Sequence, residues 1–466
     1  MRLLPLLLAT LLLASCATAP QPTPVAATPA TPAVAATPAL DPHFAVPTTD
    51  DGLPGTGPIR RYPWFKKLWQ ERRSKWAASV AQDQGAIVFL GDSITQGWHD
   101  DMDGLFPELK VANRGISGDT TRGVLIRLQE DVISLKPKAV VLLIGTNDLD
   151  EPGGNPWEAV TNIRYILDEL RKANPAMPVV LCQVMPSSGK KNRPAFMIRR
   201  INQMILDATA DLPNVTVLDT WKLFATPQND AKPEEFPDLL HPNNAGYVKW
   251  AKALRLVFAT LGYLDRENDE FTIENDFVPL FNGHDLTGWG YRATTPEDIE
   301  SATRWQASFE SAPWPINKAA VRFDGLTASP DGRYVARAGR LIVTTPPGGR
   351  RIQQLWTTQD FPKNFVLRLQ FRATPNTDSG VYLRGPQLQC RDYLLAGPYT
   401  KLQNYKPQEW NDLEVTVKNG VAYCTCNGEV LEEAMKVPAT GPIGLEGDRG
   451  QMEYRRIRMM ELPAAQ

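Results

Sequence analysis

The feature that most constrains the fold is an alternation of short apolar runs with longer amphipathic stretches between residues 62 and 265. The apolar runs have the length of strands, and the stretches between them carry apolar side chains at helical spacing. The expected strands are 86–90, 140–144, 179–184 and 215–218, and the expected helices are 62–83, 119–135, 157–173, 193–210 and 244–261. This alternation is typical of βα units and predicts an α/β domain with a parallel sheet covered on both faces.

The pattern changes after residue 265. Short runs of alternating apolar and polar side chains are separated by Gly, Pro and Asn turns, and no long helical period is seen. The runs lie at 335–336, 341–344, 366–371, 380–383, 413–417 and 421–426. Residues 270–466 are therefore expected to form a separate all-β sandwich or jelly roll.

The first sixteen residues resemble a bacterial lipoprotein signal. Arg2 is followed by an apolar run from Leu3 to Leu13, which is shorter than the roughly 20 residues that a membrane span needs. The run ends at Leu-Ala-Ser-Cys16, so the resemblance implies that Cys16 is lipidated and becomes the new N-terminus. A simple signal peptide or a buried anchor with an incidental cysteine is the alternative.

Residues 17–61 are expected to be an extended tether, because their N-terminal part is rich in Pro, Ala and Thr. Ala17 after the cysteine resembles the pattern of outer-membrane lipoproteins, so we expect a lipid-anchored protein of the cell envelope. The 50 basic and 52 acidic side chains leave no basic excess, which weighs against a nucleic-acid partner.

Polar blocks follow the expected strands of the α/β domain. They are Gly-Asp-Ser-Ile-Thr at 91–95, Asn-Arg-Gly-Ile-Ser-Gly-Asp-Thr at 113–120, Gly-Thr-Asn-Asp at 145–148 and Asp-Leu-Leu-His-Pro at 238–242. Because the carboxyl ends of parallel strands meet at one edge of the sheet, these blocks are expected to lie together. In type, order and spacing they resemble the SGNH (GDSL-type) hydrolases over about residues 62–265. That resemblance implies a three-layer, flavodoxin-like fold and a serine ester hydrolase without metal or organic cofactor.

The residue types support a nucleophilic mechanism on their own. A serine hydroxyl needs a base to remove its proton and a third group to orient that base. His241 has Asp238 three residues earlier, so Ser93, His241 and Asp238 form the expected nucleophile, base and orienting group. The chain has four histidines, and the other three lie in the tether, shortly after the serine and in the second domain: His43, His99 and His284.

The resemblance also implies an oxyanion hole formed by the backbone N–H groups of Ser93 and Gly118 and by the side chain of Asn147. Asp92 and Asp148 are expected to brace the loops around it. Trp98 follows the nucleophile, and the sequence leaves open whether it lines the substrate pocket or packs locally.

The second domain opens with Phe-Val-Pro-Leu-Phe-Asn-Gly-His-Asp-Leu-Thr-Gly-Trp-Gly at 277–290 and continues with Asp-Ser-Gly-Val-Tyr-Leu-Arg at 378–384. Over about 272–462 these blocks resemble the 3-keto-disaccharide hydrolase domains, which implies a concanavalin-like jelly roll. Where that family commonly has Glu in a Glu-x-Gln-x-x-Asp run, this chain has Gln387, and Arg449 replaces a frequent His. A carboxamide cannot act as a general acid or base. A binding or vestigial role is therefore favoured over cleavage.

Sugar-binding candidates in the second domain are Arg384, Gln389 and Asp392, which offer hydrogen-bonding groups. Trp289, Trp356 and Trp410 could stack on sugar rings, although core packing is the simpler expectation. Cys182 is expected to be a buried free thiol. For the remaining cysteines two possibilities stay open: a disulfide between Cys390 and Cys424 or Cys426, or buried free thiols.

Together these patterns predict a lipid-anchored esterase that removes acetyl or other short acyl groups from a carbohydrate, with a second domain that binds or acts on the same glycan. The expected partners are an acylated glycan or another small ester, and the membrane through Cys16. Three alternatives remain: a lysophospholipase or other lipid-ester hydrolase, a glycoside hydrolase acting on 3-keto sugars through the second domain, and a non-catalytic glycan-binding protein.

Overall fold

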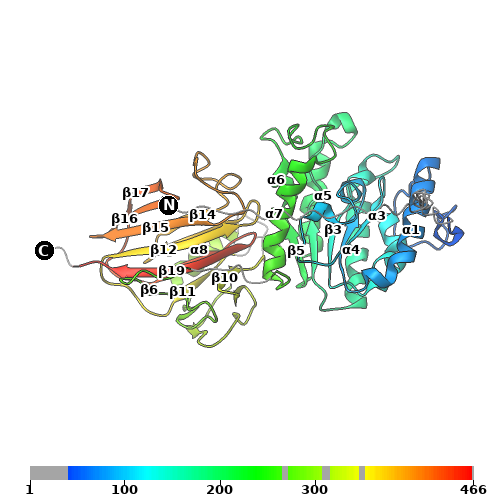
Figure 1. Ribbon diagram of the computed structural model, residues 1–466. Coiled ribbons are helices and arrows are strands. Elements are labelled where there is room, and N and C mark those ends of the chain that lie inside the picture. The colour runs from blue at the N-terminus through cyan, green and yellow to red at the C-terminus, as the bar shows by residue number, and fades with distance from the viewer. Residues whose placement is uncertain (1–39, 265–270, 307–314, 346–351, 464–466) are drawn as a thin grey trace, which may run out of the picture. The chain divides into compact units, whose positions relative to one another are not determined.

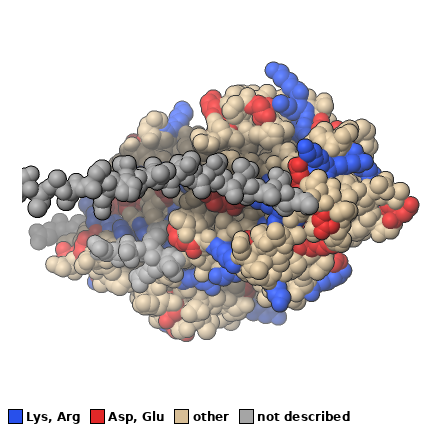
Figure 2. Space-filling view, turned by 45° about the vertical axis from the view of Figure 1, so that its right-hand side comes forward, with Lys and Arg blue, Asp and Glu red and all other residues tan. Residues whose placement is uncertain are grey.

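The computed structural model describes residues 40–264, 271–306, 315–345 and 352–463 (Figure 1). The expected signal sequence, Cys16 and most of the expected tether lie outside these ranges. Among the helices in them, none has both the length and the apolar character needed to cross a membrane. On the face drawn in Figure 2, basic and acidic side chains are interspersed and do not gather by sign.

The first half of the described chain is the expected α/β domain. Its five parallel strands have the order β2-β1-β3-β4-β5, which is the flavodoxin-like order. The strands are β1 (Ile87–Gly91), β2 (Val111–Gly115), β3 (Ala139–Leu143), β4 (Val179–Cys182) and β5 (Val215–Leu218). The helices are α1 (Pro63–Asp83), α2 (Ser93–Gln96), α3 (Thr121–Asp131), α4 (Pro156–Ala173), α5 (Ala195–Ala208), α6 (Thr220–Phe224) and α7 (Asn244–Thr260). Short 3-10 helices lie at Pro42–Phe44, Met102–Gly104, Ile133–Leu135, Asn147–Leu149 and Gly189–Lys191.

Both faces of this sheet are buried, which explains its nearly continuous apolar strands. Val88 and Leu142 belong to a cluster with side chains of α3, α4 and α5. Phe89 and Val141 point the other way, because successive strand residues alternate, and pack with α7. The parallel sheet is thus held between two apolar layers.

The segment before α1 differs from the expected tether. Residues 40–61 pack on the domain, with Val46 and Ile59 buried in a cluster that includes Trp69. Arg122 Nη1 donates a hydrogen bond to Asp50 Oδ2 at 2.7 Å. Residues 40–61 form almost no regular structure. They pack on the domain nonetheless, because a few apolar anchors and ion pairs hold them.

The second half forms two antiparallel sheets, with strand orders β17-β16-β15-β12-β19-β10-β9 (β6 pairs with β19) and β14-β13-β18-β11-β7-β8. Their strands are β6 (Val278–Pro279), β7 (Trp289–Tyr291), β8 (Val321–Arg322), β9 (Tyr334–Arg337), β10 (Arg340–Val343), β11 (Gln353–Thr357), β12 (Phe365–Ala373), β13 (Asp378–Leu383), β14 (Gln387–Arg391), β15 (Asn411–Lys418), β16 (Val421–Cys426), β17 (Glu429–Lys436), β18 (Ile443–Gly447) and β19 (Met452–Glu461). Side chains from both sheets share one large apolar core. The expected fold class, an α/β domain joined to a β-sandwich, is confirmed.

One helix in the second half was not expected. α8 (Pro296–Gln306) carries Glu297 and Asp298 in its first turn and Arg304 in its last turn. This charge order complements the helix dipole and stabilises the helix.

The four cysteines in the described ranges are free and buried, so the structure selects the thiol alternative over a disulfide. Cys424 and Cys426 share the inward face of β16 and belong to the sandwich core together with Cys390.

Candidate active site

Ser93 lies where β1 ends and α2 begins, at the carboxyl edge of the parallel sheet. Asp92 forms the N-cap of α2, and its Oδ1 accepts a hydrogen bond from the Ile94 N–H at 2.9 Å. The short strand-to-helix turn presents the Ser93 side chain at the edge of the sheet. Burial raises the pKa of Asp92 to about 7, so its carboxyl takes up a proton more readily than an exposed aspartate does.

The structure brings the three expected catalytic side chains together. Ser93 Oγ lies 2.9 Å from His241 Nε2, and His241 Nδ1 lies 2.8 Å from Asp238 Oδ2. With the His241 proton on Nδ1 and donated to Asp238, Nε2 is free to accept the Ser93 proton. This is the geometry that a serine nucleophile and its base require.

Asp238 is held by its own turn. Its Oδ1 accepts hydrogen bonds from the backbone N–H of His241 at 2.8 Å and of Leu240 at 3.0 Å. Leu239 has a φ of +63°, which allows the chain to fold back so tightly. Partial burial opposes ionisation, but the hydrogen bonds from His241 and Leu240 outweigh it and lower the pKa of Asp238 to about 2. The Asp238 carboxylate therefore stays charged at neutral pH.

Gly118 is the second expected oxyanion donor, and its surroundings require a glycine. Its φ is +86°, and a Cβ at this position would lie 2.6 Å from the Trp64 ring and 3.0 Å from Arg60 Nη1. Ser93, as the first residue of α2, has an N–H that no intrahelical bond uses. The loop with Gly118 is joined to the serine turn because the Ser117 N–H donates to Gln96 Oε1 at 2.7 Å.

Asn147 supplies the expected side-chain donor, and its amide orientation is set by two neighbours. Its Nδ2 donates to the Asp119 carbonyl at 2.9 Å, and its Oδ1 accepts from Arg193 Nη2 at 2.9 Å. One N–H of the amide remains for an oxyanion. Arg193 is almost fully buried and also donates through Nε to the Thr146 carbonyl at 3.1 Å, so it fixes the whole turn.

The comparison with known families agrees with this geometry. Residues 89–249 match the model of the GDSL-like lipase/acylhydrolase family. These residues form a GDSL-like acylhydrolase domain. Residues 276–460 match the model of the 3-keto-alpha-glucoside-1,2-lyase-like domain.

Curated relatives match the α/β half of the chain. Platelet-activating factor acetylhydrolase IB subunit alpha2 of Homo sapiens is 27% identical over 212 residues, which is 44% of this chain and 90% of the relative. Subunit alpha1 from Bos taurus is 29% identical over 197 residues, or 41% of this chain and 83% of the relative. A crystal structure of a GDSL-like lipase from Bacteroides thetaiotaomicron is 27% identical, with a TM-score of 0.37, and covers 41% of this chain and 98% of that one.

Two residues near the acylhydrolase site have other roles. Trp98 is fully buried and stacks on Trp250 with centroids 4.6 Å apart, so it packs in the core and does not line a substrate pocket. His99 is exposed, and its Nδ1 lies 2.6 Å from Asp103 Oδ1. His241 is thus the histidine that contacts Ser93. No cluster of acidic, His or Cys side chains suited to a metal ion occurs in the described ranges.

Sequence reasoning missed Arg193 and Trp64. Trp64 lies before the matched family region, is half exposed, and places its ring edge against Gly118. Tyr62 is similarly exposed, and its ring plane lies within 10° of that of Trp64, with centroids 6.4 Å apart. The two stacked rings form a partly exposed aromatic surface beside the oxyanion loop. The sequence showed only that Trp64 has helical spacing. Whether its ring is exposed or buried depends on how the helix packs in the folded domain.

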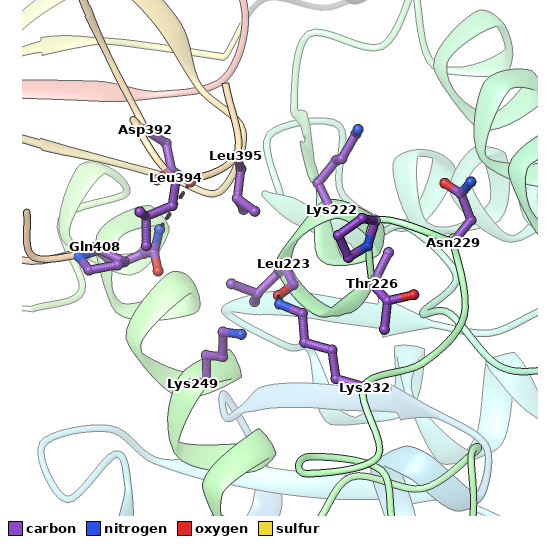
Figure 3. Close-up of a pocket in the computed structure, with 13 residues that line it drawn as sticks. Lys222, Leu223, Thr226, Asn229, Lys232, Lys249, Asp392, Leu394, Leu395 and Gln408 are labelled. Carbon is purple, nitrogen blue, oxygen red and sulfur yellow. Dashed lines mark hydrogen bonds between the residues drawn. The ribbon is translucent and has the colours of Figure 1, made fainter. Parts of the chain in front are cut away.

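The three sugar-binding candidates of the second domain do not form one site. Arg384 lies in the turn between β13 and β14, donates to the Pro438 carbonyl at 3.1 Å, and lines a cavity of about 380 Å³. Asp392 lies at the other end of β14 and borders a different pocket, shown in Figure 3. The length of β14 separates the two, because a strand rises about 3.3 Å per residue. Gln389 points to neither group and donates to Gln387 Oε1 at 2.9 Å.

The pocket that Asp392 borders is also lined by Lys222, Lys232 and Lys249 from the acylhydrolase half (Figure 3). Asp392 itself accepts hydrogen bonds from the Asn376 N–H at 3.0 Å and from the Tyr405 hydroxyl at 3.2 Å. The Asp392 carboxyl is thus fully buried and already hydrogen-bonded within the sandwich.

The three tryptophan candidates lie in three different surroundings. Trp289 is fully buried, and its Nε1 donates to the Leu280 carbonyl at 2.8 Å. Trp410 lies close to two guanidinium groups, with its ring centroid 4.5 Å from Arg372 Cζ and 4.1 Å from Arg455 Cζ. Trp356 is half buried and lines the cavity that Arg384 also borders. Of the three, Trp356 is the one placed to contact a ligand.

Proposed function

We propose that the first domain is a serine esterase that removes acetyl or other short acyl groups from a carbohydrate. The observation that carries the proposal is the continuous hydrogen-bonded series from Ser93 Oγ through His241 to Asp238. The second domain would bind the same glycan or act on it. The chain would be held at the cell envelope, at the outer membrane, by lipid on Cys16.

In the proposed mechanism, His241 Nε2 takes the proton of Ser93 Oγ as this oxygen attacks the ester carbonyl. The negative charge that forms on the carbonyl oxygen accepts hydrogen bonds from the N–H groups of Ser93 and Gly118 and from Asn147 Nδ2. His241 then gives its proton to the leaving alcohol. A water molecule, deprotonated by the same histidine, hydrolyses the acyl-Ser93 intermediate and restores the enzyme.

Three features support a short acyl group on a bulky, polar alcohol. The relatives are named platelet-activating factor acetylhydrolases, and this supports an acetyl group as the acyl part of the substrate. The His241 and Asp238 side chains are 41% and 44% exposed, so the site is open at the surface. The flat rings of Tyr62 and Trp64 beside the oxyanion loop offer the kind of surface on which a sugar ring packs.

The test is hydrolysis of 4-nitrophenyl esters from acetate to long acyl chains, together with acetylated oligosaccharides, by the full chain. We expect turnover of the short esters and release of acetate from the oligosaccharides. A preference for long chains would instead establish the second candidate, a lipid-ester hydrolase, which the expected membrane anchor favours. Absence of turnover on every ester would contradict both.

Replacing Trp64 with alanine should weaken recognition of the glycan without affecting the chemistry. Loss of one stacked ring costs about 0.5–1.5 kcal/mol beyond its area, so KM for an acetylated oligosaccharide should rise about two- to tenfold. The kinetic constants for 4-nitrophenyl acetate, which has no sugar, should stay within a factor of two.

Trp157→Ala is the matched control, because Trp157 is 69% exposed on α4 and lies outside the surface formed by Tyr62 and Trp64. This control should change neither substrate's constants. If Trp64→Ala lowers kcat equally for both substrates, the ring supports the Gly118 loop and does not select the alcohol.

A further inference from the structure

The pocket in Figure 3 lies where the α/β domain meets the sandwich, and it has a volume of about 390 Å³. This volume falls within the range of sites for small molecules. The α/β domain contributes Lys222, Lys232 and Lys249 to its lining, and the sandwich contributes Leu394 and Gln408 among others. None of the residues of the proposed ester hydrolysis lines this pocket.

Two polar contacts hold the two walls of the pocket together. Asp219, the N-cap of α6, accepts a hydrogen bond at Oδ2 from Asn376 Nδ2 of the sandwich at 2.8 Å. On α7, Lys252 Nζ lies 2.6 Å from Glu409 Oε1 of the sandwich. The elements that carry the pocket lysines, α6 and α7, are thus each joined to the second domain.

Two of the three lysines extend toward each other (Figure 3). Lys249 Nζ lies 2.8 Å and 3.2 Å from the two carboxylate oxygens of Glu235. Lys232 Nζ donates to the Leu223 carbonyl at 3.3 Å, which carries no charge. Within the described ranges, Lys222 and Lys232 form no ion pair, so two positive charges of the pocket lack a counter-charge.

The surroundings of Lys232 favour a bound anion. Burial lowers the pKa of Lys232, and the Lys249 cation lowers it further, against a weaker attraction from Glu235. A half-buried cation beside a second cation is unfavourable, and a negative charge placed close to both relieves the repulsion. The pocket therefore favours an anionic ligand over a neutral or cationic one.

The acidic residue of the lining, Asp392, is shielded from a ligand. Its side chain is fully buried, and it accepts hydrogen bonds from the Asn376 N–H at 3.0 Å and from the Tyr405 hydroxyl at 3.2 Å. Lys222 is exposed, and Lys232 is half buried. A ligand that enters the pocket therefore meets the ammonium groups and not the carboxyl.

The rest of the lining suits a sugar. Leu394 is 43% exposed, and with Leu395 it offers apolar contact from the sandwich. Thr226 and Asn229 offer a hydroxyl and an amide from a tight turn, in which the Asn229 N–H donates to the Thr226 carbonyl at 2.8 Å. Apolar walls with a few fixed polar groups match the C–H faces and hydroxyl edges of a sugar ring.

The pocket and the catalytic turn belong to one loop, residues 225–241. The Ala231 N–H donates to the Ser187 carbonyl at 3.1 Å, and Ser187 Oγ donates to the Leu239 carbonyl at 2.8 Å. Ser187 is fully buried, so it fixes both parts of the loop. Leu239 lies between Asp238 and His241, and a ligand in the pocket therefore contacts the loop that carries two of the expected catalytic groups.

We propose that this pocket binds a sugar unit that carries a carboxylate, held by Lys222, Lys232 and Lys249, and that this unit is part of the glycan whose ester the first domain hydrolyses. A carboxylate is the group that Lys249 already binds in Glu235. Binding in the pocket stands on its own, whereas the link between the bound sugar and the ester substrate rests on the proposed function. The sandwich then takes part in substrate recognition by forming one wall of the pocket.

The test is calorimetric titration of the full chain with trigalacturonic acid and, as its neutral counterpart, α-1,4-linked galactotriose. We expect the acidic trisaccharide to bind at least about tenfold more tightly, because hydrogen bonds to charged groups are stronger than neutral ones. Lys232→Gln should weaken its binding by about tenfold or more for the same reason, and Lys232→Arg, which keeps the charge, should retain most of the affinity. Equally tight binding of inorganic phosphate would show that the pocket takes a free anion, and would overturn the sugar assignment.

Lys172→Gln is the matched control, because Lys172 is exposed on α4 and pairs with Glu169 at 2.6 Å, away from the pocket. It should bind trigalacturonic acid like the wild type, and thermal unfolding should show that every variant is folded. Equal affinity of the wild type for the two trisaccharides would overturn the proposal. Unchanged affinity in Lys232→Gln would overturn it as well.

The same titration with Ser93→Ala separates this inference from the proposed function, since binding does not need the nucleophile. A chain that binds trigalacturonic acid but hydrolyses no ester would contradict the proposed function and leave the pocket assignment standing. The link between the two is measured as acetate release from acetylated forms of both trisaccharides. We expect kcat/KM to favour the acidic substrate by at least about tenfold, and Lys232→Gln to remove most of this preference. Equal kcat/KM for both substrates in the wild type would overturn the link.

Discussion

Replacing Ser93 with alanine should lower kcat for 4-nitrophenyl acetate by about 10⁴-fold or more, because the oxygen that forms the acyl intermediate is removed. The hydroxyl is the atom that His241 Nε2 contacts at 2.9 Å. The substitution removes one oxygen from a half-buried side chain, so the thermal unfolding midpoint should hardly change. The initial rate of nitrophenolate release measures the effect, and retained stability shows that the fold is intact.

His241→Ala should cause a loss of similar size, and the double variant Ser93→Ala/His241→Ala should be no slower than either single variant. Residues that act as one unit show such non-additive losses. His99→Ala is the matched control, since His99 pairs with Asp103 and does not contact the serine. Losses that multiply in the double variant, or a large effect at His99, would contradict the proposed pair.

Asn147→Ala should lower kcat by about 10²–10³-fold, the usual effect of losing one oxyanion donor. KM should change little, because the donor acts on charge that develops during the reaction. The measurement is a full kinetic comparison on a short-chain ester. Arg193→Met should give a smaller loss of kcat, since Arg193 orients the Asn147 amide from behind through its contact at 2.9 Å with Oδ1.

Asn155→Ala controls for the loss of an asparagine elsewhere. Asn155 caps α4, and its Oδ1 accepts from the Glu158 N–H at 3.0 Å. This substitution should lower stability by about 1 kcal/mol and leave kcat unchanged. If Asn147→Ala reduces stability but not kcat, Asn147 is a structural residue and the oxyanion is held by the backbone alone.

The parallel sheet could be predicted closely, because strands buried on both faces must be apolar throughout. The run 215–218 is the strand Val215–Leu218, and the stretch 62–83 is the helix Pro63–Asp83. Segment 40–61 could not be predicted, since its folding depends on anchors such as Val46 and Ile59 that have no local periodicity. The role of Trp98 was equally undecidable, because a tryptophan after a nucleophile has the same sequence signature in a core and in a pocket.

The sequence by itself determined the two fold classes and the order in which the expected catalytic groups occur, because strand period, helix period and short polar blocks are local properties. Only the tertiary structure decided which groups meet across long separations. It placed Arg193 behind Asn147, the Trp64 ring on Gly118, and Ser187 against the Leu239 carbonyl. Each of these contacts depends on strand register and helix packing. Those are set by burial summed over the whole domain, which no short stretch of sequence displays.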